Sequence, residues 1–205
     1  MSSRAIFAGE PAKGWQPWGI LVPLLGIAFV LASVGVFTIV LQHANLVDPQ
    51  ENPVGLAGFA AFLFVPFTAL IVVTIAWTRL VEGRKLSTLG LMTARPARRF
   101  VLGILVGVAM IGMIVAADWA AGAFAFGGVA RAFISPQALA GIAVLLAGFA
   151  LQSSAEELLF RGWMMSALAY KFGAVPAVLV SSLVFTLLHA TRGASWLFFP
   201  NVFLF

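Results

Sequence analysis

The sequence contains no cysteine, and only 9% of its residues carry a charge, against roughly 25% in an average soluble domain. The absence of cysteine excludes disulfide bonds, zinc–thiolate sites and a thiol nucleophile. The shortage of charge, together with 62% hydrophobic residues and a mean hydropathy of +1.06, excludes an ordinary soluble domain. We therefore expect a membrane protein whose main partner is lipid.

The net charge of +5 comes from 12 basic residues, and half of these lie in one stretch, Arg79 to Arg99. A nucleic-acid-binding protein needs a basic groove with stacking side chains beside it. A basic stretch enclosed between two apolar runs is instead typical of a cytoplasmic loop. We therefore predict no nucleic-acid partner.

About 20 apolar residues are needed to cross a ~30 Å hydrocarbon core, and five apolar runs of the sequence are compared with this length. A sixth run begins at Ser195 and is still apolar at Phe205, but it is too short to cross. We predict an all-α, polytopic membrane helix bundle of five complete transmembrane helices and the start of a sixth, forming one integral membrane domain over residues 1–205 that is truncated at its C-terminus. The predicted complete spans are Gly19 to Leu41, Gly55 to Thr78, Phe100 to Ala117, Ala138 to Phe160 and Ala174 to Ala190.

The loops between the runs predict the orientation. The stretch Arg79 to Arg99 is basic, whereas the loop Gln42 to Val54 holds two acids and no basic residue. The positive-inside rule therefore places the basic loop, the N-terminus and the turn around Lys171 in the cytoplasm. The segment Asp118 to Gln137 then faces outward, and the expected location is the bacterial inner (cell) membrane.

Three charges, Glu156, Glu157 and Arg161, continue an apolar run with no helix-breaking signal between them. The pattern predicts one helix from about Ala138 to Tyr170, capped near Gly173, with both carboxylates in its interior. A charge within a membrane helix costs from ~2.5 kcal/mol upward and by default marks a functional site. The i,i+4 spacing puts Glu157 and Arg161 on one face, with Glu156 turned about 100° away.

His189 is the second polar residue within an apolar run. If the chain folds back at Gly173, Glu157 and His189 are equally far from the turn along the sequence, and so are Arg161 and Phe185. At about 1.5 Å per residue these pairs lie roughly 24 Å and roughly 18 Å from it. An antiparallel hairpin is therefore predicted to bring the carboxylates level with the imidazole, with Phe185 one turn away on the face of His189.

Simpler interpretations of the same residues remain open. Glu157 and Arg161 can be a neutralising ion pair that fixes helix packing. Glu156 can reach a water pocket, and His189 can be a hydrogen-bonded packing residue.

The pattern Glu156-Glu157-x-x-x-Arg161 followed by Phe185-x-x-x-His189 resembles the first two motifs of the CPBP intramembrane proteases. This is the CAAX-prenyl protease and bacteriocin-processing group, also called ABI or Rce1-like. The stretch Leu89-Gly90-Leu91 is similar to one that often precedes the core of that family, so the resemblance covers about residues 87–205. The family's third motif, a His followed four positions later by Asn, is absent from this sequence.

The resemblance implies an intramembrane endopeptidase that hydrolyses a peptide bond with water activated by Glu156 and assisted by His189. Glu157 and Arg161 would then be the supporting scaffold, with Phe185 beside them. The substrate would be a peptide or protein, prenylated or not, or a bacteriocin precursor. Because the third motif would supply the oxyanion donors, a chain without it is expected to be inactive or nearly so.

The sequence leaves the cofactor open between a divalent metal such as zinc and none; if a metal is used, Glu156 and His189 are the candidate ligands. A rhomboid-type serine protease using Ser195 would leave both glutamates unexplained. A proton- or ion-coupled transporter, and a non-catalytic membrane protein that binds peptides or gives self-immunity to a bacteriocin, are the alternatives from other classes.

Overall fold

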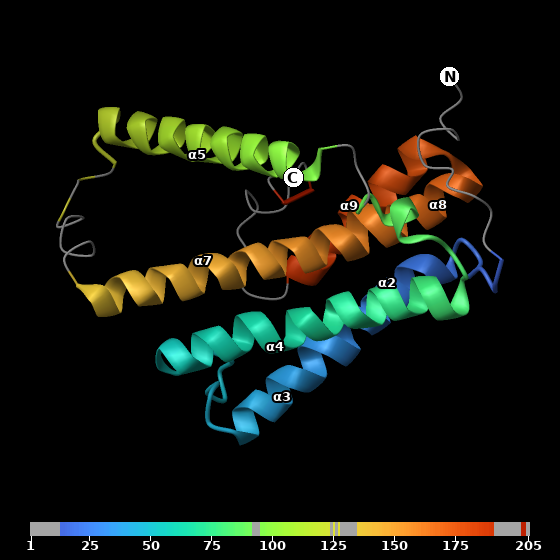
Figure 1. Cartoon of the computed structure of the whole chain (residues 1–205), viewed down its shortest axis with the longest axis horizontal. Helices are drawn as coiled ribbons and strands as arrows, with labels where there is room; N and C mark the ends of the chain where they lie inside the picture. Colours follow the sequence, from blue (N-terminus) through green and yellow to red (C-terminus); the bar gives the residue numbers. More distant parts are fainter. Residues whose placement is uncertain are drawn as a thin grey trace. The chain divides into compact units, whose positions relative to one another are not determined.

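The computed structural model describes residues 13–91, 95–123, 125, 127, 135–190 and 202–203 (Figure 1). Within these ranges the chain is helical, and its β-type pairing is a single isolated bridge between Val47 and Pro53. The predicted all-α fold is confirmed. The predicted start of a sixth span, from Ser195, lies outside the described residues except for 202–203.

The chain divides into two compact units, residues 1–91 with 144–205, and residues 92–143. The second unit contains α5, Pro96–Ala120, which begins with a proline in its first turn and is 25 residues long. None of its residues is buried in the protein. A helix that is apolar on all sides and unburied is suited to a lipid environment.

The first unit begins with two apolar helices that are long enough to cross a membrane. The first runs from Leu21 to His43 and consists of α2 (Leu21–Val30), a π-helical turn η1 (Leu31–Gly35) and α3 (Val36–His43). The second runs from Gly55 to Val81 as α4 (Gly55–Ala76) and a second π-helical turn η2 (Trp77–Val81). Both agree with the predicted spans within a few residues.

The fourth apolar run continues into the predicted long helix, which extends from Pro136 to Phe172. It is composed of α7 (Pro136–Glu156), a π-helical segment η4 (Glu157–Met164) and α8 (Met165–Phe172). Gly173 ends it with φ +88°, a backbone angle that suits glycine. The chain then turns back into α9 (Ala174–His189), so the predicted fold-back point is confirmed.

By length and composition, four described helices can span a membrane, and α9 is a shorter apolar helix of 16 residues. The sequence predicts five complete transmembrane helices, and all five predicted runs are apolar helices. Four of them are long enough to span a membrane by this criterion, and α9, which ends one residue before Ala190, is the shorter one.

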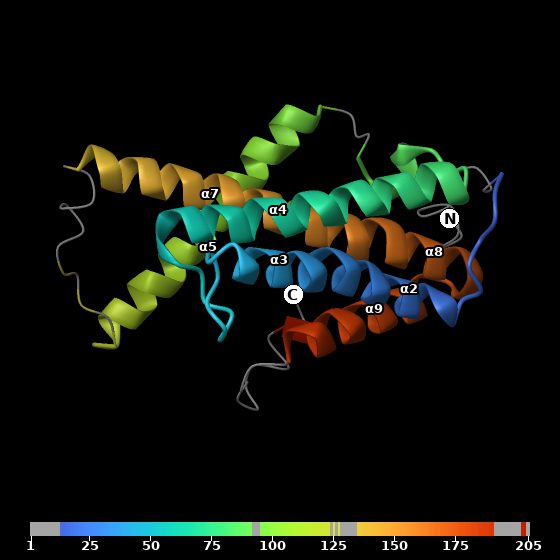
Figure 2. The ribbon, with the colours of Figure 1, turned by 90° about the horizontal axis from the view of Figure 1, so that it is seen from below.

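The core of the first unit lies where α2, α4, η4 and α8 meet (Figure 2). Its largest fully buried side chain is Trp163 of η4, and Leu70, Leu159, Met164 and Val22 are also fully or almost fully buried. Burying these apolar side chains against one another fixes η4 between the first two apolar helices and α9.

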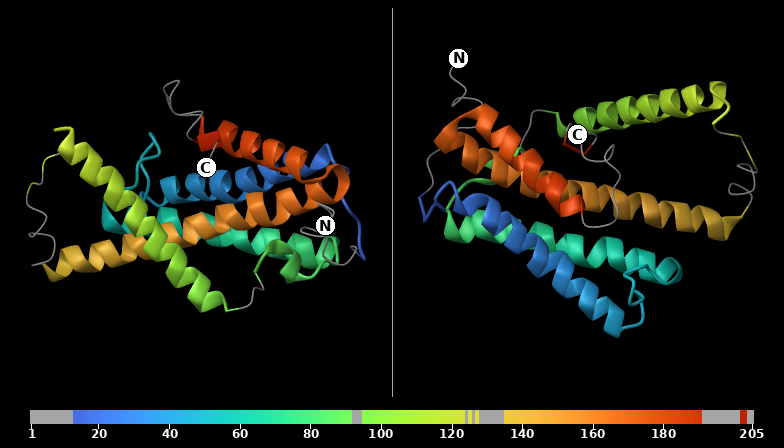
Figure 3. Two further views of the ribbon diagram at one scale, coloured as in Figure 1. Left: turned by 90° about the horizontal axis from the view of Figure 1, so that it is seen from above. Right: turned by 180° about the vertical axis from the view of Figure 1, so that it is seen from behind.

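Three connecting segments of the first unit lie at one end of its helices (Figure 3). The backbone N–H of Gly14 donates to the carbonyl of Glu82 at 3.0 Å, and the Lys171 ammonium donates to the carbonyl of Pro17. The segment before α2, the loop after α4 and the turn before α9 therefore share one end. This agrees with the prediction that all of them lie on the same side of the membrane.

Candidate functional site

The candidate site is built on η4, which begins at Glu157 and ends at Met164. In a π-helix the hydrogen bonds join residues five apart, so one extra residue is accommodated per turn, and such segments often occur at functional sites. The α-helical periodicity of the sequence did not predict this segment. It lies directly after Glu156 and contains Glu157 and Arg161, the residues that the sequence singled out.

Glu157 and Arg161 form the predicted ion pair. Nη1 of Arg161 lies 2.5 Å from Oε1 of Glu157. The Glu157 side chain is 56% exposed and that of Arg161 is 30% exposed, so the pair lies on the outside of the helix bundle and not in its core. Each charge therefore has a partner close by in an apolar part of the chain.

Glu156 points in a different direction and has a different partner. Its carboxylate accepts a hydrogen bond of 3.1 Å from Nε2 of Gln152, one turn earlier on α7. Glu156 is half-buried. The two neighbouring carboxylates thus differ in their surroundings, because Glu157 is neutralised by a cation and Glu156 is held by a neutral amide.

Arg161 also joins η4 to α9. Its guanidinium carbon lies 5.5 Å from the centre of the Phe185 ring, within the range of a cation–π contact. The Phe160 and Phe185 rings pack edge to face with centroids 5.1 Å apart, and the hydroxyl of Ser181 donates to the carbonyl of Phe160 at 2.8 Å. The predicted register, with Arg161 and Phe185 at the same distance from Gly173, is therefore confirmed.

His189 continues this line of contacts by one turn of α9. Its ring lies 4.2 Å from that of Phe185, centroid to centroid, and its Nδ1 is 2.8 Å from the carbonyl oxygen of Phe185. Since a carbonyl can only accept, Nδ1 carries the hydrogen in this contact. In the neutral ring Nε2 is then the nitrogen with a free lone pair, which is the form that a proton acceptor or a metal ligand requires.

The comparison with protein families adds an independent observation to this geometry. Residues 137–205, about a third of the 205-residue chain, match the family model described as type II CAAX prenyl endopeptidase Rce1-like. This segment is similar to the Rce1-like family. The match contains both motifs on which the resemblance was based, although it begins later than the predicted core at residue 87. No curated protein and no solved structure matches the chain.

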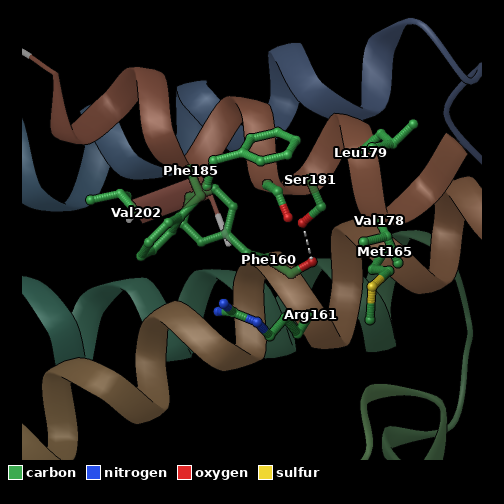
Figure 4. Close-up of a pocket in the computed structure, with 10 residues that line it drawn as sticks. Phe160, Arg161, Met165, Val178, Leu179, Ser181, Phe185 and Val202 are labelled. Carbon is green, nitrogen blue, oxygen red and sulfur yellow. Dashed lines mark hydrogen bonds between the residues drawn. The ribbon is translucent and has the colours of Figure 1, made fainter. Parts of the chain in front are cut away.

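Two pockets of the first unit adjoin the Rce1-like motifs. The first, of about 370 Å³, lies between η4, α8 and α9, with Arg161 and Phe185 among its lining residues (Figure 4). Its other walls are mainly apolar, including Met165, Val178 and Phe203. The guanidinium of Arg161 thus lies in a mainly apolar pocket, in which Ser181 and Ser182 are the other polar residues of the described lining.

The second pocket, of about 650 Å³, lies between His189 and the first apolar helix. The imidazole and Leu188 form one wall. The first apolar helix forms most of the rest, with Val34, Ile39 and Gln42 among its residues, and Glu51 of the loop before α4 also lines the pocket. A volume of this size suits a ligand of several apolar groups. His189 is therefore a polar group at the edge of a largely apolar cavity.

Within the described residues, neither carboxylate forms a direct hydrogen bond with His189, and no group of three or more His, Cys, Asp or Glu side chains that could hold a metal ion occurs. Glu157 and the imidazole are linked instead through Arg161 and Phe185, whereas Glu156 is bonded to Gln152. The role of Glu156 and His189 as metal ligands stays a prediction.

A buried polar cluster of Glu82, Arg84, Trp163 and Ser166 lies beside the site and was not predicted from the sequence. Glu82 and Arg84, assigned to a cytoplasmic loop, are 1% and 8% exposed, and they contact Trp163 and Ser166 on the motif helix. The nearby Leu89 packs on η4 as well, because a side chain at Gly162 would come within 2.9 Å of the Leu89 carbonyl oxygen. The only signal in the sequence was that Glu82 is a single acid among basic residues. Such a residue in a loop is ordinarily expected to be exposed to solvent.

Proposed function

We propose that this protein is an intramembrane endopeptidase in which Glu156 activates the water that attacks a peptide bond. The observation that carries the proposal is the contact between Arg161 and Phe185, which brings the two Rce1-like motifs to one level of the α7–α9 hairpin. The match to a protease family supports the reaction class. The roles given below to individual residues are part of the proposal.

Glu156 is the better base of the two glutamates. Its hydrogen-bond partner is the neutral Gln152 amide, so no cation holds it in the ionised form, whereas Glu157 is paired with Arg161. A general base must have a carboxylate that is free to contact water, and the carboxylate of Glu157 is instead engaged by Arg161. Gln152 then positions the carboxylate of Glu156 toward the water molecule.

His189 acts with Glu156 in this proposal. The bond from Nδ1 to the Phe185 carbonyl sets the ring orientation and leaves Nε2 available. Nε2 holds the attacking water or receives its proton during the attack. The apolar pocket beside His189 accommodates the apolar part of the peptide substrate or of a lipid attached to it.

Glu157, Arg161 and Phe185 form the scaffold. The ion pair fixes the orientation of Arg161, and Arg161 and Phe185 join the two helices that carry Glu156 and His189. The protein would lie in the bacterial inner membrane, with the end that holds the loop after α4 in the cytoplasm, as the charge of that loop indicates.

The test is cleavage of a fluorogenic peptide, with and without a C-terminal prenylcysteine, by the protein in liposomes, alone and joined to helices that carry the third motif of the Rce1-like family. The second form is included because a chain without that motif is expected to have little or no activity. We expect Glu156→Gln to abolish turnover and His189→Ala to lower it by about 10²-fold, the scale of a general acid–base contribution. Ser154→Ala is the matched control, because Ser154 is an exposed polar residue of the same helix whose hydroxyl bonds only the Ala150 carbonyl. Full cleavage by Glu156→Gln would refute the proposal, and tight binding of the peptide without cleavage by either form of the wild type would favour the peptide-binding alternative.

A further inference from the structure

The loop after α4 reaches into the first unit and contacts the motif helix through buried polar groups. Oε1 of Glu82 accepts a hydrogen bond of 3.0 Å from the indole N–H of Trp77 and one of 2.9 Å from that of Trp163. Trp77 belongs to η2, just before the loop, whereas Trp163 belongs to η4, 81 residues away from Glu82. One carboxylate oxygen therefore joins the two π-helical segments.

Arg84 makes the second connection. Its Nε lies 3.1 Å from Oε2 of Glu82, and its Nη2 donates to the hydroxyl of Ser166 at 2.9 Å. That hydroxyl donates in turn to the backbone carbonyl of Trp163 at 2.9 Å. Trp163 is thus held at its side chain by Glu82 and at its backbone by Ser166.

The sharp turn between the two charges depends on Gly83. Its φ is +62°, and an added Cβ would lie 3.2 Å from the backbone nitrogen of Gly14. Because this turn is tight, Glu82 and Arg84 both point inward. The side chains of Glu82, Arg84, Trp163 and Ser166 are almost fully buried, so the hydrogen bonds among them are protected from competing water.

The position of Trp163 makes this cluster relevant to the site. Trp163 lies two residues after Arg161 in the same π-helical segment, and it is completely buried. The sequence of η4 must adopt a hydrogen-bond register other than that of the α-helices on either side, and a rotation of this segment would move Arg161 and Glu157 relative to Phe185. A fixed anchor on Trp163 opposes that rotation.

We propose that Glu82 is a positioning residue of the hydrolytic site, which acts through Trp163 and Ser166 to hold η4 in its π-helical register. This inference rests on the proposed function for its effect on catalysis. Its structural part, the orientation of η4, is independent of any activity.

The sharpest test compares Trp163→Phe with Trp77→Phe. Each variant deletes one indole N–H donor to the same oxygen of Glu82 and keeps an aromatic ring, but only Trp163 lies on η4. We expect Trp163→Phe to lower kcat at least about tenfold with little change in KM, because a small misplacement of reacting groups has large effects on rate. Trp77→Phe should leave kcat within about twofold of the wild type, since η4 keeps its anchor.

A second measurement does not require activity. The chain has no cysteine, so Ser154→Cys and Leu187→Cys can carry spin labels at exposed positions of α7 and α9. The label distance distribution should change in the Trp163→Phe background and remain unchanged in the Trp77→Phe background. Equal effects of both substitutions on rate and on distance, or a lower melting temperature of Trp163→Phe with unchanged kcat and distance, would overturn the inference.

These outcomes separate the two proposals. If neither the wild-type chain nor its version with the third motif cleaves peptides, the proposed function fails, and the distance measurement alone then decides whether Glu82 positions η4. If the wild type cleaves but the two variants behave alike, the positioning inference fails and the proposed function stands.

Discussion

The guanidinium of Arg161 lies over the ring of Phe185, 5.5 Å from its centre, although the two residues belong to different helices of the hairpin. Both residues are equally far along the chain from Gly173, at which the hairpin turns. The contact therefore reports the register of the hairpin directly. A shift of one helix along the other would break it.

The Arg161–Phe185 contact is expected to contribute a measurable coupling energy. In a double-mutant cycle with Arg161→Gln and Phe185→Leu, unfolding in mixed detergent should give a coupling of about 0.5–1 kcal/mol, the usual size of a cation–π contact. Purely additive effects of the two substitutions would show that the contact does not hold the helices together.

Glu156 and His189 are predicted to lie within reach of one bridging water molecule. In this cysteine-free chain, Glu156→Cys with His189→Cys should be joined efficiently by a short bifunctional thiol reagent, because the register puts both side chains at one level. Arg161→Cys with Phe185→Cys serves as the positive control. If Ser154→Cys with His189→Cys reacts as well as the Glu156 pair, the proposed proximity is wrong.

The Glu82–Arg84 ion pair is expected to show strong non-additivity. Both side chains are almost fully buried, at 1% and 7% exposure, and burial lowers the pKa of Arg84 while the charge of Glu82 opposes that effect. Glu82→Met or Arg84→Met alone should reduce the free energy of unfolding by about 3–5 kcal/mol, since each leaves an uncompensated buried charge. The double variant should lose less than either single one, as measured by unfolding in detergent.

The loop before α4 is expected to loosen at low pH. The backbone N–H and the side-chain amide of Asn52 donate to Asp48, and these hydrogen bonds lower the pKa of Asp48 below its ordinary value of 3.8. A lowered pKa means that the stabilisation is present above pH 3.8 and is lost as the pH falls through the lower value of the folded protein.

Amide hydrogen exchange of residues 48–54, corrected for the intrinsic rate, should therefore rise below that pH in the wild type. In Asp48→Asn, which has no titrating group at this position, the rise should be smaller, because Glu51 is then the acid of this loop that still titrates. A pH dependence that is the same in both proteins would exclude Asp48 as its cause.

The sequence alone determined the helices and the register of the hairpin. Runs of apolar residues define membrane-length helices even where they contain a proline, as α4 contains Pro66, and every residue of an α-helix adds the same rise along its axis. Counting from Gly173 therefore aligned Arg161 with Phe185 before any contact was known. The ion pair of Glu157 with Arg161 followed in the same way from local spacing.

Only the tertiary structure decided which side chains and which backbone conformation surround the site residues. The π-helical register of η4 and the burial of Glu82 depend on side chains that meet in space. Glu82 and Trp163 are 81 residues apart, and no local pattern couples them. An acid in a basic loop is solvated unless a buried donor is brought to it, and the packing of η4 brings Trp163 to Glu82.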